Sequence, residues 1–122
     1  MDGINHLHAD IVEKINQKNR NTPIIIASLK PNTSILVKTQ NSLYTIVIIE
    51  GNSVLLQGGE TWLKPTPVYF NGSTWGGNLL WYGRIGYNMF LEFLTPLGLF
   101  MTSPVKNAKI TSPDGWFYEM DW

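Results

Sequence analysis

Aromatic side chains are concentrated in one part of the chain, and aromatic rings are the groups best suited to hold a flat ligand. Nine of them fall between residues 62 and 93: Trp62, Tyr69, Phe70, Trp75, Trp81, Tyr82, Tyr87, Phe90 and Phe93. Exposed rings of this kind stack on sugars or on the unstacked bases of single-stranded nucleic acid. The same rings also fill the interior of a small barrel, and in alternating strands about half of them must point inward. We expect Trp62, Trp75 and Tyr87 to point outward, because they lie in or beside predicted loops.

A glycine-rich loop is predicted over residues 71–77, which read NGSTWGG. Its glycines allow backbone conformations that other residues resist, and its hydroxyls and backbone N–H groups could bind an anion. The hydroxyls of Ser73 and Thr74 could instead bond only to the local backbone. The loop matches neither a nucleophile elbow nor a Walker loop. The predicted binding residues are Ser73, Thr74, Trp75, Trp62 and Tyr87.

Residues that could support catalysis are few. Two carboxylates facing each other across a cleft can hydrolyse a glycosidic bond, and Glu60 or Glu92 could belong to such a pair. A structural ion pair or a solvated position is the stronger interpretation of both. His6 and His8 are the only histidines, and residues two apart on a helix point away from each other, so they cannot share a metal ion. Since cysteine is also absent, we expect no catalytic residue, no metal site and no cofactor.

Composition narrows the class of protein. The 122 residues are 43% hydrophobic, which indicates one folded domain rather than a disordered chain. Nine Lys and Arg residues balance nine Asp and Glu residues, so binding to the phosphates of duplex DNA is not expected. The polar start of the sequence lacks the features of a signal peptide, and no apolar run is long enough to span a membrane. We therefore expect a cytoplasmic protein whose partners include neither a membrane nor duplex DNA.

The spacing of apolar residues predicts one helix followed by short strands. Apolar residues recur every three or four positions over residues 3–20, which predicts an amphipathic helix. The period then changes to two, and three antiparallel strands joined by tight turns are predicted at 34–40, 43–50 and 53–57. The prolines of residues 62–67 exclude that stretch from a central strand.

The second half of the chain predicts further short strands separated by glycines. A last strand is expected at the edge of the sheet over residues 105–110. The expected fold is mainly β, a small antiparallel SH3-like or otherwise rolled barrel with one N-terminal amphipathic helix. We expect a single domain over 1–122, made of the helix at 3–20, the barrel at 24–110 and an acidic, aromatic tail at 111–122.

The tail combines negative charge with large aromatic side chains. It carries three carboxylates and no cation, and its aromatic residues include Trp116, Phe117 and Trp122. If these three large aromatic side chains were exposed to water without a partner, they would favour aggregation. We expect these rings to be buried by docking, within the chain or across a dimer, in preference to the alternative of a free recognition tail.

Five short motifs of the chain together carry a resemblance to known sequences. They are TQNSLYTI at 39–46, the glycine pair at 58–59, NGSTWGG at 71–77, GRIGYNMFLEF at 83–93 and TSPV at 102–105. This set of motifs resembles a group of small bacterial proteins of unknown function, over about residues 30–110. The resemblance implies a compact β fold and supplies no activity.

We interpret the chain as a non-enzymatic binding or interaction module that associates with a protein partner or with itself. Self-association is expected because a small sheet must protect its edges and because aromatic residues are enriched at interfaces. One alternative is a ligand-binding barrel that stacks a sugar or a single-stranded base on Trp75 and Trp62, and another is a small hydrolase that uses a pair of glutamates. Within the first two interpretations, the loop at 71–77 is the expected functional surface, with Trp75 as its anchor.

Overall fold

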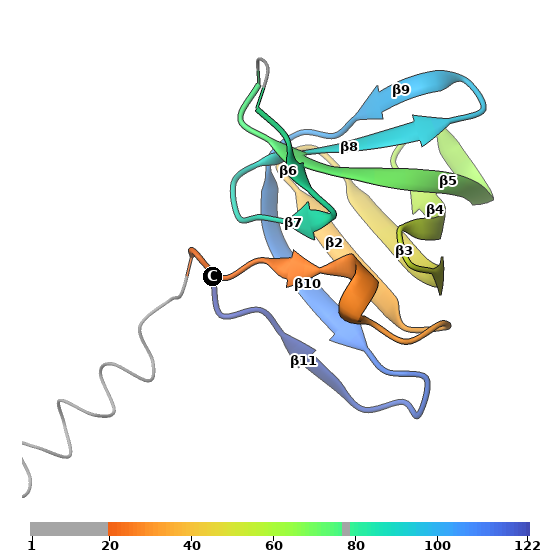
Figure 1. Cartoon of the computed structure of the whole chain (residues 1–122), viewed down its shortest axis with the longest axis vertical. Helices are drawn as coiled ribbons and strands as arrows, with labels where there is room; N and C mark the ends of the chain where they lie inside the picture. Colours follow the sequence, from red (N-terminus) through yellow and green to blue (C-terminus); the bar gives the residue numbers. More distant parts are fainter. Residues whose placement is uncertain (1–19, 77–78) are drawn as a thin grey trace, which may run out of the picture.

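The computed structural model describes residues 20–76 and 79–122, and these are built almost wholly from antiparallel strands (Figure 1). The elements are β1 (Ile24–Ile25), the short 3-10 helix η1 (Ile26–Ser28), β2 (Ser34–Thr39), β3 (Leu43–Glu50), β4 (Ser53–Gly58), β5 (Trp62–Thr74), β6 (Trp81–Tyr82), β7 (Arg84–Ile85), β8 (Phe90–Thr95), β9 (Gly98–Met101), β10 (Val105–Thr111) and β11 (Phe117–Glu119). The prediction of a mainly β, antiparallel fold is confirmed.

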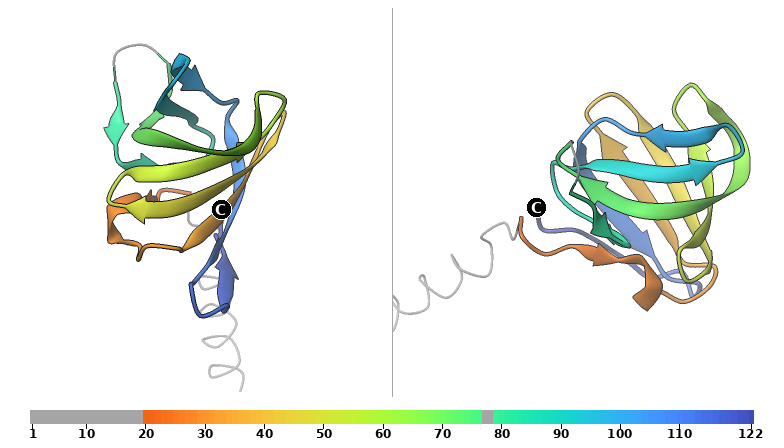
Figure 2. Two further views of the ribbon diagram at one scale, coloured as in Figure 1. Left: turned by 90° about the vertical axis from the view of Figure 1, so that its right-hand side faces the viewer. Right: turned by 45° about the horizontal axis from the view of Figure 1, so that its top comes forward.

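One large sheet contains most of these strands. Its order is β11-β10-β2-β3-β4-β5-β8-β9, with β6 paired to β5, while β1 and β7 form a separate two-stranded sheet. The large sheet bends so that β5, β8 and β9 cross over β2, β3 and β4 (Figures 1 and 2). It is not a closed barrel, because β9 and β11 end the strand order instead of pairing with each other.

Two backbone hydrogen bonds connect the segment before β8 with the start of β10, which lies in the other half of the bent sheet. The N–H of Asn88 donates to the carbonyl of Val105 at 2.7 Å, and the N–H of Val105 donates to the carbonyl of Met89 at 3.0 Å. These bonds join the chain just before β8 to the first residue of β10. The two halves of the sheet are therefore connected at this end and enclose the core between them.

The core follows from strict alternation along the strands. Ile35 and Val37 of β2, Ile46 of β3 and Phe93 of β8 are fully buried, and the residues between them face outward. Period-two alternation places successive side chains on opposite faces of a sheet, so these strands have one buried and one exposed face. The predicted three-stranded meander is confirmed as β2, β3 and β4.

Residues 62–67 are part of a strand, but they pair on one side only, as the prediction that they avoid a central strand requires. They form the first half of β5, which lies between β4 and β8 in the sheet. Strand β8 pairs only with the second half of β5, from Tyr69 onward, so Pro65 and Pro67 have β4 as a neighbour on one side. A proline is tolerated there because no second strand requires its missing N–H.

The predicted loop at 71–77 also begins later than expected, since β5 continues to Thr74. Gly72 lies opposite Tyr82 of β6 and Glu92 of β8 in the strand register. Its φ is +150°, and a Cβ atom at this position would collide with the carbonyl group of Trp81. The glycine is therefore required because two backbone segments approach each other closely here.

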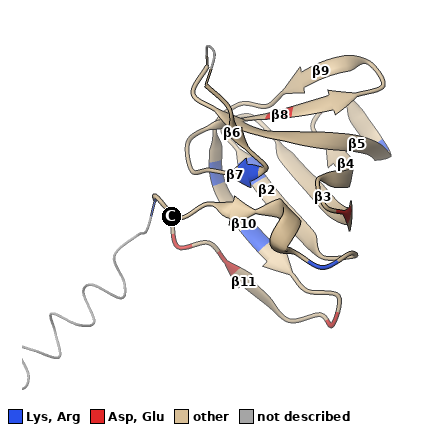
Figure 3. Cartoon of the chain, in the orientation of Figure 1, with Lys and Arg blue, Asp and Glu red and all other residues tan. Residues whose placement is uncertain are grey.

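The tail docks on its own chain, but only in part as expected. Strand β11 pairs with β10, so β10 is an interior strand and not the predicted edge. Trp122 is 5% exposed, and its indole N–H donates to the carbonyl of Thr22 at 2.9 Å. Trp116 and Phe117 are exposed on the single chain, so docking within the chain buries only Trp122 of the three, and burial of the other two across a dimer stays a prediction. Glu119 of β11 lies opposite Lys109 of β10 in the strand register, and Figure 3 shows the acidic position of β11 near a basic position of β10.

The predicted helix over residues 3–20 lies outside the described residues except for Arg20, which is in a turn. Within the described ranges, no helix has the length and apolar character needed to cross a membrane.

Candidate functional site

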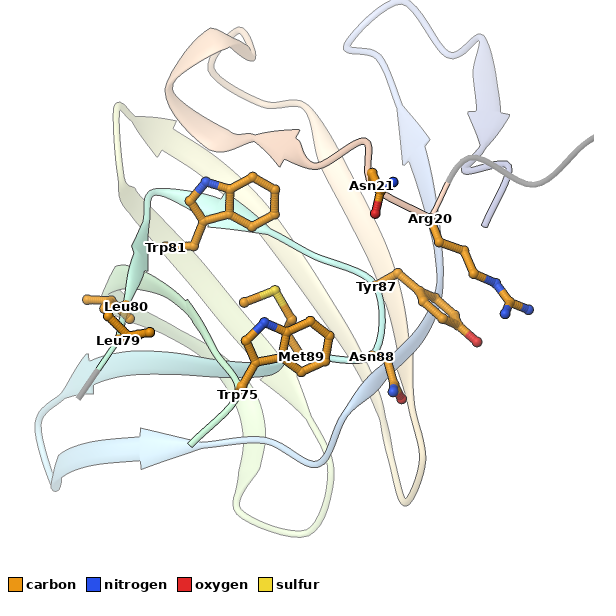
Figure 4. A pocket seen from close by; sticks show the side chains of 9 residues that line it. All are labelled: Arg20, Asn21, Trp75, Leu79, Leu80, Trp81, Tyr87, Asn88 and Met89. Atoms are coloured by element: carbon orange, nitrogen blue, oxygen red, sulfur yellow. The ribbon is translucent and has the colours of Figure 1, made fainter. Parts of the chain in front are cut away.

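A hollow of about 610 Å³ lies beside the ends of β5 and β6 and the segment that leads from β7 to β8 (Figure 4). Its lining consists of Arg20, Asn21, Trp75, Leu79, Leu80, Trp81, Tyr87, Asn88 and Met89. We call it the aromatic pocket. Its volume falls within the range of about 300–1,000 Å³ that is typical of small-ligand sites. Two of the predicted binding residues, Trp75 and Tyr87, line it.

Two indole side chains dominate this pocket. Trp75 is 61% exposed, and Trp81 is 36% exposed. They come from opposite sides of one hairpin, because Ser73 of β5 pairs with Trp81 of β6 and Trp75 follows directly after β5. Figure 4 shows both rings at the pocket, with the side chain of Met89 between them in this view. Trp81 was not predicted to be a binding residue.

The packing of Trp81 and Met89 at the pocket requires a glycine at position 86. A Cβ atom on Gly86 would collide with the sulfur of Met89 and would lie 3.2 Å from the ring of Trp81. Met89 is only 5% exposed, so it cannot move away freely. Glycine at this position thus allows the indole of Trp81 to lie against the backbone.

Tyr87 lines the pocket but already has neighbours around its ring. The guanidinium of Arg20 lies 4.7 Å from the ring centre, the ammonium of Lys106 lies 6.0 Å from it, and the Trp122 ring is tilted against it at 6.1 Å. Lys106 also donates to the side-chain oxygen of Asn88 at 2.5 Å. The cations of Arg20 and Lys106 therefore lie close to the Tyr87 ring at the rim of the pocket, in cation–π contact with it.

Ser73 and Thr74 are buried, and their hydroxyls bond to the backbone. The Ser73 hydroxyl donates to the carbonyl of Arg84 at 2.5 Å and accepts from the N–H of Gly86 at 3.0 Å. The Thr74 hydroxyl accepts from the N–H of Gly76 at 3.0 Å. The Ser73 bonds join β5 to residues 84–86, and the Thr74 bond holds the backbone just after β5, so the two residues position the pocket wall and do not line its interior.

Trp62 does not lie at the surface, and the expectation that it would is wrong. It is 5% exposed and packs edge-on against Phe100 of β9, with the ring centres 5.4 Å apart. Its indole nitrogen is buried and has no hydrogen-bond partner among the residues that the structure describes. Trp62 is the first residue of β5 and points to the same face of the sheet as Val68 and Phe70.

The candidate carboxylates lie elsewhere. Glu92 of β8 accepts a hydrogen bond from the amide of Asn71 at 2.9 Å, and Glu60 lies in the turn between β4 and β5. Neither residue lines the aromatic pocket. In the described part of the chain, no three His, Cys, Asp or Glu side chains come close enough to hold a metal ion. His6 and His8 lie outside that part.

A hydrogen-bonded tyrosine pair lies next to Trp81 in sequence. The hydroxyls of Tyr69 on β5 and Tyr82 on β6 bond to each other. The bond with Tyr82 lowers the pKa of the Tyr69 hydroxyl, and the same bond raises the pKa of the Tyr82 hydroxyl. The pair connects β6 to the outer side of β5, which helps to hold the hairpin that carries Trp81.

A second hollow, of about 300 Å³, lies between η1 and the turn before β11. The rings of Trp116 and Tyr118 line it and stack against each other, with centres 6.3 Å apart and planes at 21°. Trp116 and Tyr118 are 63% and 45% exposed, but this hollow has about half the volume of the aromatic pocket and includes the carboxylate of Asp114 in its lining.

Comparison of the chain with protein-family models, with curated proteins and with solved structures gives no match. Function must therefore be inferred from the geometry of the chain itself.

Proposed function

We propose that the protein is a non-enzymatic binding module whose site is the aromatic pocket, and that this pocket stacks the bases of a single-stranded nucleic acid. One observation carries the proposal: the indoles of Trp75 and Trp81 are both exposed and line the same hollow. Stacking of bases on aromatic side chains contributes about 1–3 kcal/mol per base and tolerates any base, because every base has a π face.

The polar groups around the pocket favour a base that carries a phosphate over a neutral sugar. The cations Arg20 and Lys106 flank the rim at Tyr87, and none of the pocket-lining residues in ranges 20–76 and 79–122 is a carboxylate. A phosphate next to a stacked base would approach these cations, whereas a neutral sugar would gain nothing from them. Asn21 and Asn88 add amides that can hydrogen bond to base edges.

The fold supports the same proposal. Strands β5 and β6 hold the two indoles on a hydrogen-bonded hairpin, which lowers the ordering cost of binding. We class the sheet as a rolled, incompletely closed barrel, on the basis of the hydrogen bonds between Val105 and the segment before β8. The cytoplasmic location expected from the sequence stays a prediction.

Titration of the full chain with three probes tests the proposal. The probes are oligothymidine and oligoadenosine of about ten nucleotides, within the usual site size of one barrel, and maltohexaose as a neutral sugar. Tryptophan fluorescence reports binding. We expect saturable quenching by both oligonucleotides, weaker binding at higher salt and no response to the sugar.

Matched variants locate the site. Trp75→Ala and Trp81→Ala should each weaken oligonucleotide binding by about 5- to 150-fold, which corresponds to about 1–3 kcal/mol. Trp116→Ala removes an equally exposed indole far from the pocket in sequence and should bind as the unmodified chain does. If only maltohexaose gave saturable binding, the ligand would be a sugar and the proposal of a stacked base would be wrong. The absence of binding to any probe, or equal weakening by all three variants, would overturn the proposed site.

A further inference from the structure

The β8–β9 hairpin exposes an apolar surface that carries no charge. Leu94 and Leu99 face each other across the two strands and are 52% and 69% exposed, while Leu97 in the turn is 79% exposed and Met101 is 48% exposed. Residues 93–103 contain no Asp, Glu, Lys or Arg. Monomeric proteins rarely leave a contiguous apolar patch uncovered, so this hairpin has the features of a contact surface.

The backbone of β9 is also unpaired on one side. Among the residues that the structure describes, β9 is the last strand of the sheet and pairs only with β8. Thr95 lies opposite Gly98, and the N–H of Thr102 donates to the carbonyl of Leu91 at 2.9 Å, which fixes the alternation of hydrogen bonds along the hairpin. Residues 98, 100 and 102 thus point their polar backbone groups toward β8. The N–H and carbonyl groups of Leu99 and Met101 point toward the free edge.

The two edges of the large sheet differ in charge. The edge at β11 carries Glu119 and is followed by Asp121, so two copies of that edge would meet with like charges. The edge at β9 has no charged residue, no proline and no register shift in its pairing with β8, which are the features that usually keep an edge strand from pairing. Only the β9 edge can therefore meet its own copy without charge repulsion.

We propose that β9 pairs antiparallel with β9 of a second copy of this chain, around a two-fold axis at Phe100. In this register Leu99 of one copy lies opposite Met101 of the other, and the two residues exchange both backbone hydrogen bonds. The arrangement is isologous, because the symmetry operation repeats the same pair on the other side of the axis. It joins the two large sheets into one and places Leu99 of each copy beside Met101 of the other on the same face.

This inference is independent of the aromatic pocket. None of the residues that line the pocket belongs to the hairpin of residues 90–101. A dimer formed at β9 uses none of the pocket's lining residues, so the loss of either proposal leaves the other in place.

The oligomeric state of charge variants tests the pairing and its register. Light scattering on the full chain should give twice the chain mass of 13.8 kDa. The double variant Leu99→Lys/Met101→Lys places like charges directly opposite each other across the axis and should give the monomer mass. Leu99→Glu/Met101→Lys places opposite charges in the same positions and should restore the dimer. The control Leu36→Lys changes an exposed residue of the interior strand β2 and should remain dimeric.

Several results would overturn the proposal: a monomer mass for the unmodified chain at all concentrations, a dimer of the double-lysine variant, or a monomer of the Glu/Lys variant that still shows a cooperative melting transition. If the charge variants fail to fold, hydrogen exchange of the unmodified chain decides. The amides of Leu99 and Met101 should lose protection upon about a hundredfold dilution, because dimers dissociate by mass action. Protection that does not change with concentration contradicts the pairing.

Discussion

Replacement of Trp62 tests the description of the core. Trp62→Ala removes a nearly fully buried indole that packs on Phe100, and changes of this kind cost about 3–5 kcal/mol. Trp62→Phe keeps a ring in the same place and removes the indole N–H, which has no partner among the described residues. Removal of an unsatisfied buried donor returns about 1–3 kcal/mol, which offsets the loss of part of the ring. We expect Trp62→Phe to change the free energy of unfolding by less than about 1 kcal/mol.

Thermal unfolding followed by circular dichroism measures these differences. For a chain of this length, 1 kcal/mol corresponds to about 4 °C, so Trp62→Ala should melt about 12–20 °C early and Trp62→Phe within about 4 °C of the unmodified protein. Trp75→Ala, at an exposed position, should also stay within about 2 °C. If Trp62→Phe melts as early as Trp62→Ala, the indole N–H makes a hydrogen bond and its description as unsatisfied is wrong.

Three further changes have defined outcomes. Gly72→Ala should lower the free energy of unfolding by about 2–5 kcal/mol, because the added Cβ atom strains the backbone and collides with β6. The control Gly51→Ala, which also has positive φ but open space around it, should lower it by about 1–2 kcal/mol. Equal losses in denaturant unfolding would refute the close approach of β5 and β6. Ser73→Ala removes two buried hydrogen bonds to the backbone and should cost about 1–3 kcal/mol in the same assay, so an unchanged midpoint would contradict those bonds. Tyr82→Phe removes the hydroxyl whose hydrogen bond lowers the pKa of Tyr69, so that pKa should rise in an absorbance titration, and a fall would show that the bond has the opposite sense.

Local alternation was enough to predict the meander of β2, β3 and β4, because burial there follows the sequence with period two. It was not enough for β5. Whether Pro65 and Pro67 are tolerated depends on how far β8 extends along β5, and that is set by pairing between distant segments. The inward direction of Trp62 could have been read from its even spacing to Val68 and Phe70, once residues 62–74 are accepted as one strand.

The lining of the aromatic pocket was predicted in part. Trp75 was identified from its place beside glycines in a loop, and it does line the pocket. Trp81 was missed, because its position depends on the pairing of β6 with β5 at Gly72 and Ser73, which has no local signature beyond the glycine itself. The hydroxyl of Ser73 could not be assigned from sequence, since its partners, Arg84 and Gly86, come into reach only in the folded chain.

The central claim is that Trp75 and Trp81 form one stacking site, and the indole N–H resonances of the protein test it most directly. The five tryptophans give five separate signals, which single Trp→Phe variants assign. Upon titration with oligothymidine, the signals of Trp75 and Trp81 should shift along one common binding curve. That of Trp62, buried in the core, should remain in place, as should that of Trp116. Signals of Trp75 and Trp81 that stay unchanged at saturating oligonucleotide, or that follow different curves, would contradict the claim.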